Sequence, residues 1–222
     1  MLSSVEQNRD WLVTATGTCE ACPSLRDWDL LRDRYYLHQF LSDILELLAQ
    51  APQETEEWQH LPQIRRHVRQ LMLNSYWLRT QIPTPDPKTG IGVQILYDEI
   101  GYPLTVETVA YAPGVQSPIH NHGTWGAVAI LQGQEQHTFW RWHGDRLEPV
   151  GTRCFSPGEI VSFTPEAIHQ ITALGSQPSV TFNLYGDLPG GEAIGTLARE
   201  ASGTLARSRF QFDPATGAAK PF

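Results

Sequence analysis

The feature that most constrains the fold is a succession of short β-type segments between Ser75 and residue 190. They are rich in branched and aromatic residues and are separated by turns that contain glycine or proline. The expected strands are Tyr76–Ile82, Val93–Tyr97, Leu104–Tyr111, Trp125–Leu131, Thr138–Trp142, Ile160–Phe163, Ile168–Leu174 and Val180–Tyr185, with a hairpin tip at His143-Gly144-Asp145. Many short strands without intervening helices predict a mainly β domain, either a sandwich or a jelly-roll barrel.

The residues before Ser75 indicate helices. Residues 28–52 place apolar side chains at helical spacing up to Pro52, and residues 54–74 repeat the pattern. Arg65, Arg66 and Arg69 on the second helix are expected to form a solvated face. The predicted organisation is a helical N-terminal segment (1–74) packed on a β-barrel (75–190), followed by a loosely structured C-terminal tail (191–222) that folds over the barrel. All three belong to one expected structural domain.

Composition narrows the classes of partner. The chain of 222 residues has a formal net charge of −8, which argues against nucleic acid or an anionic membrane as the main partner. No apolar run approaches the roughly 18 residues of a membrane span, and the N-terminus lacks the features of a signal peptide. We therefore expect a soluble, cytoplasmic protein, a monomer or small homo-oligomer, whose partners are small molecules.

Cysteine is sparse, with three residues in the chain. Cys19 and Cys22 form a single CxxC within Thr14–Pro23, a stretch that is interpreted as polar and irregular. A zinc site would need further ligands nearby, and a redox pair should lie between a strand and a helix. Two ordinary thiols are the favoured interpretation, with a redox or metal role as the alternative.

Three histidines are the candidate metal ligands. His120 and His122 stand two residues apart in a β-rich region, so both point to the same face of a strand. His169 follows 47 residues after His122, at the start of another predicted strand. Two imidazoles on one face can chelate a transition metal, and a third would complete a ligand set of three neutral nitrogens. Among the other histidines, His137 is expected to face the same cavity without a ligand role. His38, His60 and His67 lie on the predicted helices and His143 lies at a turn, and none of them is expected to be a ligand.

At these residues the chain resembles a known family. Residues 75–190 resemble the cupins, and more narrowly the cysteine dioxygenase family of thiol dioxygenases, in the glutamine-type bacterial branch that includes 3-mercaptopropionate dioxygenase. The motifs are Ser117-Pro-Ile-His-Asn-His-Gly-Thr-Trp-Gly126, the distant His169, and Thr181-Phe-Asn-Leu-Tyr185. The resemblance implies a cupin jelly-roll barrel and Fe(II) bound by His120, His122 and His169.

One departure from other cupins has a chemical consequence. General cupins carry a glutamate shortly after the paired histidines, and that position here is Gly126. Family members with a cysteine at this position crosslink it to the active-site tyrosine, which glycine cannot do. Without a carboxylate ligand the site keeps its full positive charge and favours an anionic thiolate. The expected reaction adds O2 to the sulfur of a small thiol carboxylate and yields a sulfinic acid.

The resemblance also implies substrate contacts. Gln94, 26 residues before His120, occupies the position where animal relatives have the arginine that binds the substrate carboxylate. Arg79, expected on a neighbouring strand, is a second candidate for this charge, with a solvated arginine as the alternative. An amide offers no charged bidentate fork, so 3-mercaptopropionate should be oxidised at least as well as cysteine. Trp125, next to the histidines, is expected to wall the pocket.

Relatives carry Ser-x-His-x-Tyr on the last core strand, and this chain has Thr181, Asn183 and Tyr185 at the same spacing. All three are expected to share the face that points at the metal. Asn183 can orient the Tyr185 hydroxyl but cannot relay a proton as an imidazole can. Tyr185 is expected to hydrogen-bond the substrate or O2.

Two other functions fit the same motifs. One is a cupin dioxygenase or hydrolase that acts on a carbon substrate, and the other is a non-catalytic, metal-binding cupin that senses a small acid. The fold does not separate these functions.

Overall fold

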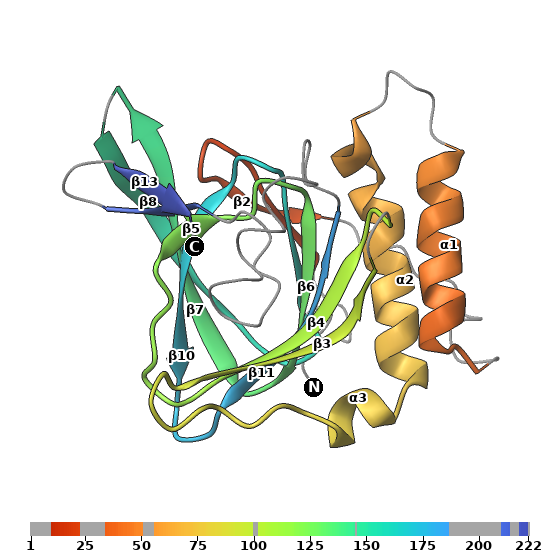
Figure 1. The fold of residues 1–222 in the computed structure, drawn as a ribbon. Coiled ribbons are helices and arrows are strands. Elements are labelled where there is room, and N and C mark those ends of the chain that lie inside the picture. The colour runs from red at the N-terminus through yellow and green to blue at the C-terminus, as the bar shows by residue number, and fades with distance from the viewer. Residues whose placement is uncertain are drawn as a thin grey trace, which may run out of the picture.

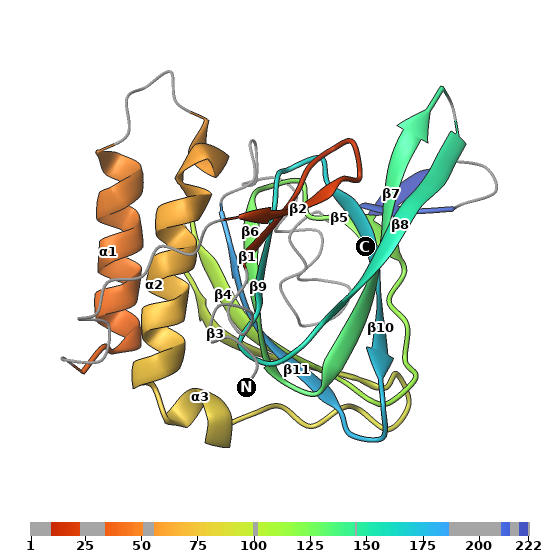
Figure 2. The ribbon, with the colours of Figure 1, turned by 180° about the vertical axis from the view of Figure 1, so that it is seen from behind.

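The computed structural model describes residues 10–22, 34–50, 56–99, 102–144, 146–186, 210–213 and 218–221. Within these ranges the strands form two sheets that face each other (Figures 1 and 2). The strands are β1 (Asp10–Val13), β2 (Cys19–Cys22), β3 (Ile91–Asp98), β4 (Thr105–Tyr111), β5 (Ile119–Asn121), β6 (Gly126–Gln132), β7 (Gln134–His143), β8 (Arg146–Phe155), β9 (Ile160–Phe163), β10 (Ile168–Leu174), β11 (Ser179–Tyr185), β12 (Phe210–Phe212) and β13 (Ala219–Pro221). One sheet has the order β2-β1-β9-β6-β11-β4-β3 and the other β13-β12-β5-β10-β7-β8.

Two helices cover the outer face of the seven-stranded sheet (Figure 1). They are α1 (Leu37–Ala49) and α2 (Leu61–Asn74), and a short 3-10 helix, η2 (Glu57–His60), precedes α2. Their apolar stripes meet the even-numbered side chains of β11, Phe182 and Leu184, in one buried cluster with Phe40 and Ile44. The odd-numbered side chains of β11 consequently face the barrel interior, because successive strand residues alternate between faces.

The N-terminal segment departs from the expected helical organisation. Residues 10–22, expected in part as irregular chain, form the β1–β2 hairpin, and β1 joins the barrel sheet by parallel pairing with β9. Gly17 has a φ of 72° in the turn of this hairpin. The local pattern did not indicate these strands, because each is four residues long and β1 is ordered by pairing with β9, which is distant in sequence.

The expectation that three arginines of α2 form a solvated face is wrong for two of them. Arg65 and Arg69 are buried and form ion pairs with the buried Asp10 of β1. Arg65 also donates to the Ser162 hydroxyl at 2.8 Å, and Arg69 donates to the carbonyl of Gly158 at 3.0 Å. These arginines therefore join the helix layer to β1 and β9.

The predicted strand Tyr76–Ile82 is wrong, because Trp77–Thr80 forms a short helix, α3. Leu78 is its one buried residue, and it fits into the helix-side cluster while Tyr76 stays exposed. A short apolar run has no periodicity that separates strand from helix, so tertiary packing decides. β8, which the sequence did not predict, is a long and mostly exposed strand that pairs with β7 and projects with it from the barrel (Figure 2).

Several expectations fall partly outside the described residues. These are positions 28–33 and 51–52 of the first predicted helix, 54–55 of the second, Asp145 of the hairpin tip, positions 187–190 of the predicted barrel, and positions 191–209, 214–217 and 222 of the tail. The described part of the tail forms β12 and β13, and β12 pairs with β5 beside His120. Among the helices of the described ranges, none is long and apolar enough to cross a membrane.

Candidate metal centre

The structure brings His120, His122 and His169 together inside the barrel. His120 on β5 pairs directly with His169 on β10, and His122 follows β5 by one residue. All three side chains are buried, and one ring nitrogen from each lies within 4.8 Å of those of the others. The sheet register thus turns a sequence separation of nearly fifty residues into a contact.

Hydrogen bonding orients the His120 ring. Its Nδ1 lies 3.0 Å from the carbonyl oxygen of Pro118. A carbonyl only accepts hydrogen bonds, so Nδ1 carries the proton and Nε2 keeps its lone pair. The Nε2 atoms of His122 and His169 are 2.9 Å apart. Two lone pairs repel at that separation, and a cation or a shared proton between them removes the repulsion.

Aromatic rings pack against two of the three histidines, His122 and His169. The Phe163 ring lies 4.4 Å from that of His169 and 5.4 Å from that of His122, measured between centroids. The Tyr185 ring stacks on His122 at 4.8 Å with an interplanar angle of 25°. Packing of this kind holds the imidazoles in place and keeps the site dry.

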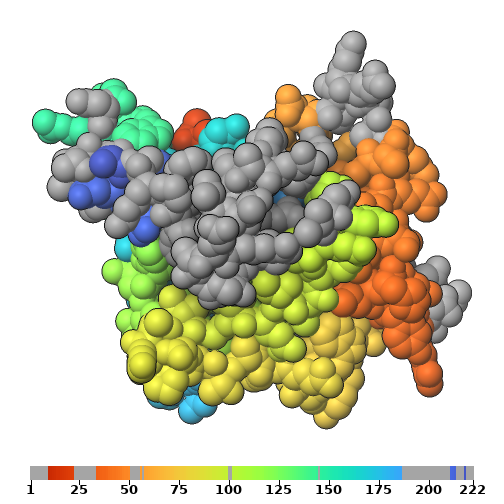
Figure 3. Space-filling view, viewed as in Figure 1, coloured from red at the N-terminus to blue at the C-terminus, as the bar shows by residue number. Residues whose placement is uncertain are grey.

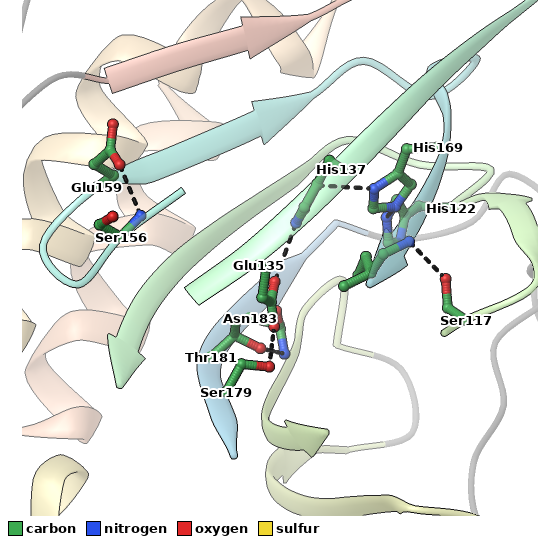
Figure 4. A network of polar contacts seen from close by, with 11 residues as sticks. Ser117, His122, Glu135, His137, Ser156, Glu159, His169, Ser179, Thr181 and Asn183 are labelled. Atoms are coloured by element: carbon green, nitrogen blue, oxygen red, sulfur yellow. Dashed lines mark hydrogen bonds and ion pairs between the residues drawn. The ribbon is translucent and has the colours of Figure 1, made fainter. Parts of the chain in front are cut away.

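The opposite sheet contributes Thr181, Asn183 and Tyr185, all buried and all on the inner face of β11. Asn183 donates from Nδ2 to the Thr181 hydroxyl at 3.2 Å, as Figure 4 shows. Gly126 pairs with Tyr185, and a Cβ at Gly126 would lie 3.0 Å from Cδ1 of the tyrosine ring. Glycine at this position therefore lets the tyrosine lie against the β6 backbone.

The three residues expected to bind the substrate are not brought to the histidines. Gln94 is exposed and pairs with Thr108, on the face of β4 that Val106 presents to the helices. β3 itself lies at the molecular surface, in the yellow to yellow-green segment of Figure 3. The pairing of β3 with β4 contains a bulge between Ile95 and Tyr97. Counting residues along the sequence therefore does not determine to which face of the sheet a β3 side chain points.

Arg79 and Trp125 also point elsewhere. Arg79 lies on α3 rather than on a strand, is exposed, and donates to the carbonyl of Met72 at 3.3 Å. Trp125 belongs to the helix-side cluster that contains Phe40 and Ala127. It packs between sheet and helices and does not wall the interior, which corrects the sequence expectation.

The sequence did not indicate three polar residues of the interior, Glu107, Glu135 and Ser179. It indicated that His137 faces the cavity, but not that it contacts the site. Glu135 and His137 lie on the inner face of β7, and Glu135 accepts a hydrogen bond from Ser179 on β11 (Figure 4). Glu107 is buried on β4 opposite Asn183. The alternation of Glu135, His137 and Phe139 was the signal available, since polar side chains that share a face with a buried aromatic residue indicate a polar interior.

Cys19 and Cys22 behave as ordinary thiols. They lie three residues apart on β2 and consequently point to opposite faces of the strand, which is unsuitable for chelation or pairing. Burial raises the pKa of Cys19 to about 12, and burial also raises the pKa of Cys22. Both groups are therefore protonated and unreactive near neutral pH.

The donor set fits a transition metal. Among the described residues, the group able to share one ion consists of three imidazoles and includes no carboxylate. Imidazole nitrogens suit iron, zinc, copper and nickel. A metal-binding role is thus compatible with the geometry, the burial and the tautomer of His120.

No family model matches the sequence. Solved structures of similar fold include oxalate oxidase in complex with glycolate, at 17% identity over 49% of this chain and 56% of that chain, with a TM-score of 0.40. A cupin superfamily protein from Desulfitobacterium hafniense matches at 14% identity over 50% of this chain and 87% of that chain, TM-score 0.40. A cupin 2 conserved barrel domain protein from Salinispora arenicola matches at 19% identity over 49% of this chain and 83% of that chain, TM-score 0.37.

The matched region spans a little over half of the oxalate oxidase chain. The two facing sheets of the described residues, with α1 and α2 ahead of most of their strands, confirm the predicted fold class, a mainly β barrel with an α-helical N-terminal segment.

Proposed function

We propose that the protein is an iron-dependent thiol dioxygenase. It adds both atoms of O2 to the sulfur of a small thiol carboxylate, 3-mercaptopropionate or cysteine, and the product is the sulfinic acid. The thiol supplies the four electrons, so no further reductant is needed. The observation that supports this proposal is the ligand group itself, three imidazoles with no carboxylate among them.

The charge of the ligand group is the physical reason. Three neutral imidazoles leave the charge of a divalent cation uncompensated within the group, so an anionic ligand from outside the protein is attracted. A thiol becomes anionic on coordination, whereas an alcohol of similar size resists deprotonation. Bound iron(II) would supply the redox chemistry that activates O2 and would lower the pKa of the thiol.

Residues of the chain would bind and orient the substrate. Tyr185 lies against His122, and its hydroxyl is the proposed hydrogen-bond donor to the substrate or to oxygen. Thr181 and Asn183 form a bonded pair on the same face, and they hold the polar side of the pocket in one arrangement. Phe163 excludes water on the side of His122 and His169.

The proposal is tested by loading the full chain with iron(II) without oxygen and then adding air-saturated buffer with each thiol. Oxygen uptake and sulfinate formation in equal amounts, measured by an electrode and by mass spectrometry, are the expected result. His169→Ala should abolish both, and His143→Ala, an exposed histidine, should retain both.

Other results distinguish the alternatives. Oxygen uptake that depends on a carbon acid and produces no sulfinate would identify a dioxygenase with a carbon substrate. Tight binding of a small acid without turnover would identify a sensor. Either outcome contradicts the thiol dioxygenase proposal.

A further inference from the structure

We propose that Glu135 and His137 are positioning residues that orient His169 toward the metal and supply, one imidazole removed, the negative charge that the ligand group lacks. This inference rests on the proposed metal-binding function. Neither residue belongs to the ligand group, and both are fully buried.

Four side chains form a continuous row from the ligand group to the opposite sheet (Figure 4). His169 Nδ1 lies 3.2 Å from His137 Nδ1. His137 Nε2 lies 3.0 Å from Glu135 Oε2, and the other carboxylate oxygen accepts from the Ser179 hydroxyl at 2.9 Å. The row therefore begins at Nδ1 of a candidate ligand on β10, crosses β7 and ends on β11.

The carboxylate determines where the protons lie. A carboxylate accepts hydrogen bonds, so Nε2 of His137 must be the protonated nitrogen, and Nδ1 of a neutral His137 carries a lone pair. That lone pair accepts the proton of His169 Nδ1. His169 is then left with its lone pair on Nε2, the atom that faces His122. Each proton position follows from the preceding one, beginning at Glu135.

The opposite arrangement is unfavourable. If a neutral His137 donated from Nδ1 to His169, its Nε2 lone pair would face the Glu135 carboxylate, and two acceptors would meet in a dry interior. His169 would then be protonated at Nε2 and unable to bind a metal. Glu135 thus selects, through His137, the tautomer of His169 whose Nε2 can bind a metal.

The row of His169, His137, Glu135 and Ser179, here called the relay, is held in place by rigid packing. The His137 ring lies edge-on to Phe155 at 4.9 Å and parallel to Phe163 at 6.2 Å, measured between centroids. Phe163 also contacts His169. A ring held on two sides cannot turn to exchange its nitrogens without displacing core side chains.

The relay places a negative charge near the site while a coordination position stays open. A carboxylate within the ligand group would occupy a coordination position, whereas a carboxylate behind His169 contributes negative charge and leaves that position open. Hydrogen bonding of this kind makes the ligand nitrogen more basic and strengthens metal binding. A Glu135–His137 pair with only a structural role would stabilise the barrel equally with and without metal.

The experiment compares Glu135→Gln, which is isosteric and removes the charge, and His137→Phe, which removes the relay nitrogens. Glu148→Gln and His143→Phe are matched controls, because that pair makes the same type of contact, at 3.2 Å, on the surface. Dissociation constants for Co²⁺ are measured by chelator competition, and imidazole N–H signals of the Co²⁺-loaded protein are measured by NMR. Circular dichroism and melting temperature establish that each variant is folded.

We expect Co²⁺ to bind about 10- to 100-fold more weakly to both relay variants. The His169 Nδ1–H signal should shift and exchange faster with solvent, and both controls should match the wild type. If His137→Phe does not fold, the isosteric Glu135→Gln decides. Folded variants with unchanged Co²⁺ affinity and unchanged N–H signals would overturn this inference and leave the proposed function standing. A wild-type chain that binds neither Co²⁺ nor Fe²⁺ would overturn both.

Discussion

Tyr185, on β11 of the seven-stranded sheet, lies against the candidate ligand His122. Its ring stacks on His122, and Gly126 on the neighbouring strand permits that position. The ring and the hydroxyl therefore have separable roles: the ring supports the imidazole, and the hydroxyl is available to the proposed substrate.

Tyr185→Phe tests the role of the hydroxyl. The stacked ring is retained, so metal affinity should not change, whereas turnover of the thiol should fall by about 10- to 100-fold, the value of one hydrogen bond to a charged group. Steady-state oxygen uptake and Co²⁺ titration measure the two effects. Tyr111→Phe, the same change on β4 in a separate cluster with Val109, is the control. Unchanged turnover and substrate affinity in Tyr185→Phe would contradict the assignment.

Asn183 is a buried amide on the inner face of β11. It donates to Thr181 and lies opposite the buried Glu107 in the β4–β11 pairing. An amide keeps one hydrogen-bonding pattern over the physiological pH range. The polar side of the proposed pocket thus holds its geometry through the amide.

At the scale of the elements, a buried ion-paired group attaches the β1–β2 hairpin to α2. Asp10 lies between two buried arginines of α2, and this ion-paired group joins the hairpin, the helix and β9. Burial of three charges is tolerated because the guanidinium groups also donate to Ser162 and Gly158.

Asp10→Asn should destabilise the fold strongly. Two guanidinium groups would keep their burial and lose their counter-charge, which costs about 3–5 kcal/mol in comparable buried pairs. Urea unfolding followed by circular dichroism measures the loss. Glu148→Gln removes a carboxylate from an exposed pair and should change stability by less than about 0.5 kcal/mol. Equal stabilities of the two variants would show that the buried group is dispensable.

The helix pair contains a titrating group. Burial lowers the pKa of His67 on α2 below its ordinary value of 6.5, an effect that Asp43 opposes and Arg66 reinforces. The hydroxyl of Tyr35 lies 2.9 Å from His67 Nδ1 and donates to Asp43 at 2.5 Å. Burial also raises the pKa of Tyr35, so this hydroxyl stays protonated.

The sign of the pH effect follows from the direction of the His67 shift. Below pH 6.5 the unfolded chain binds a proton at His67 before the folded chain does, so the free energy of unfolding falls as the pH is lowered toward the folded-state pKa. His67→Gln should flatten this dependence relative to wild type between about pH 7 and 5. Urea unfolding at a series of pH values measures it, with the exposed His38→Gln as control. Identical slopes for wild type and His67→Gln would refute the prediction.

At the scale of the whole molecule, the candidate centre lies between the two sheets. His120, His169 and His137 belong to the six-stranded sheet, and Tyr185, Asn183 and Ser179 belong to the seven-stranded sheet. A bound ion would therefore connect β5 with β10, and the relay would extend the connection across the barrel.

Metal binding should accordingly stabilise the fold. An ion at 100 times its dissociation constant adds about 2.7 kcal/mol, which corresponds to roughly 5–10 °C in the melting temperature of a chain of this size. Differential scanning calorimetry with Co²⁺ and with EDTA measures the shift. His143→Ala should retain it and His169→Ala should lose it. A shift that persists in His169→Ala would place the ion elsewhere.

Much of the architecture was predictable from local patterns. The core strands β4, β6, β9, β10 and β11 are buried at most positions and contain branched or aromatic residues, so their segments stood out in the sequence. β1, β2 and β8 did not, because their order comes from pairing with a partner: β1 and β2 are four residues long, and β8 is mostly exposed. Tyr76–Ile82 illustrates the opposite error, an apolar run that packing converted to a helix.

By itself, the sequence determined which side chains can bind a metal and that the chain forms a mainly β barrel, because residue chemistry and strand periodicity are local properties. Tertiary structure alone decided which side chains meet. The register of β5 and β10 placed His120 beside His169, the facing of β3 turned Gln94 outward, and burial turned Glu135 and His137 from unremarkable strand residues into partners of the site. Facing and burial depend on contacts between segments far apart in the chain, and local composition does not encode them.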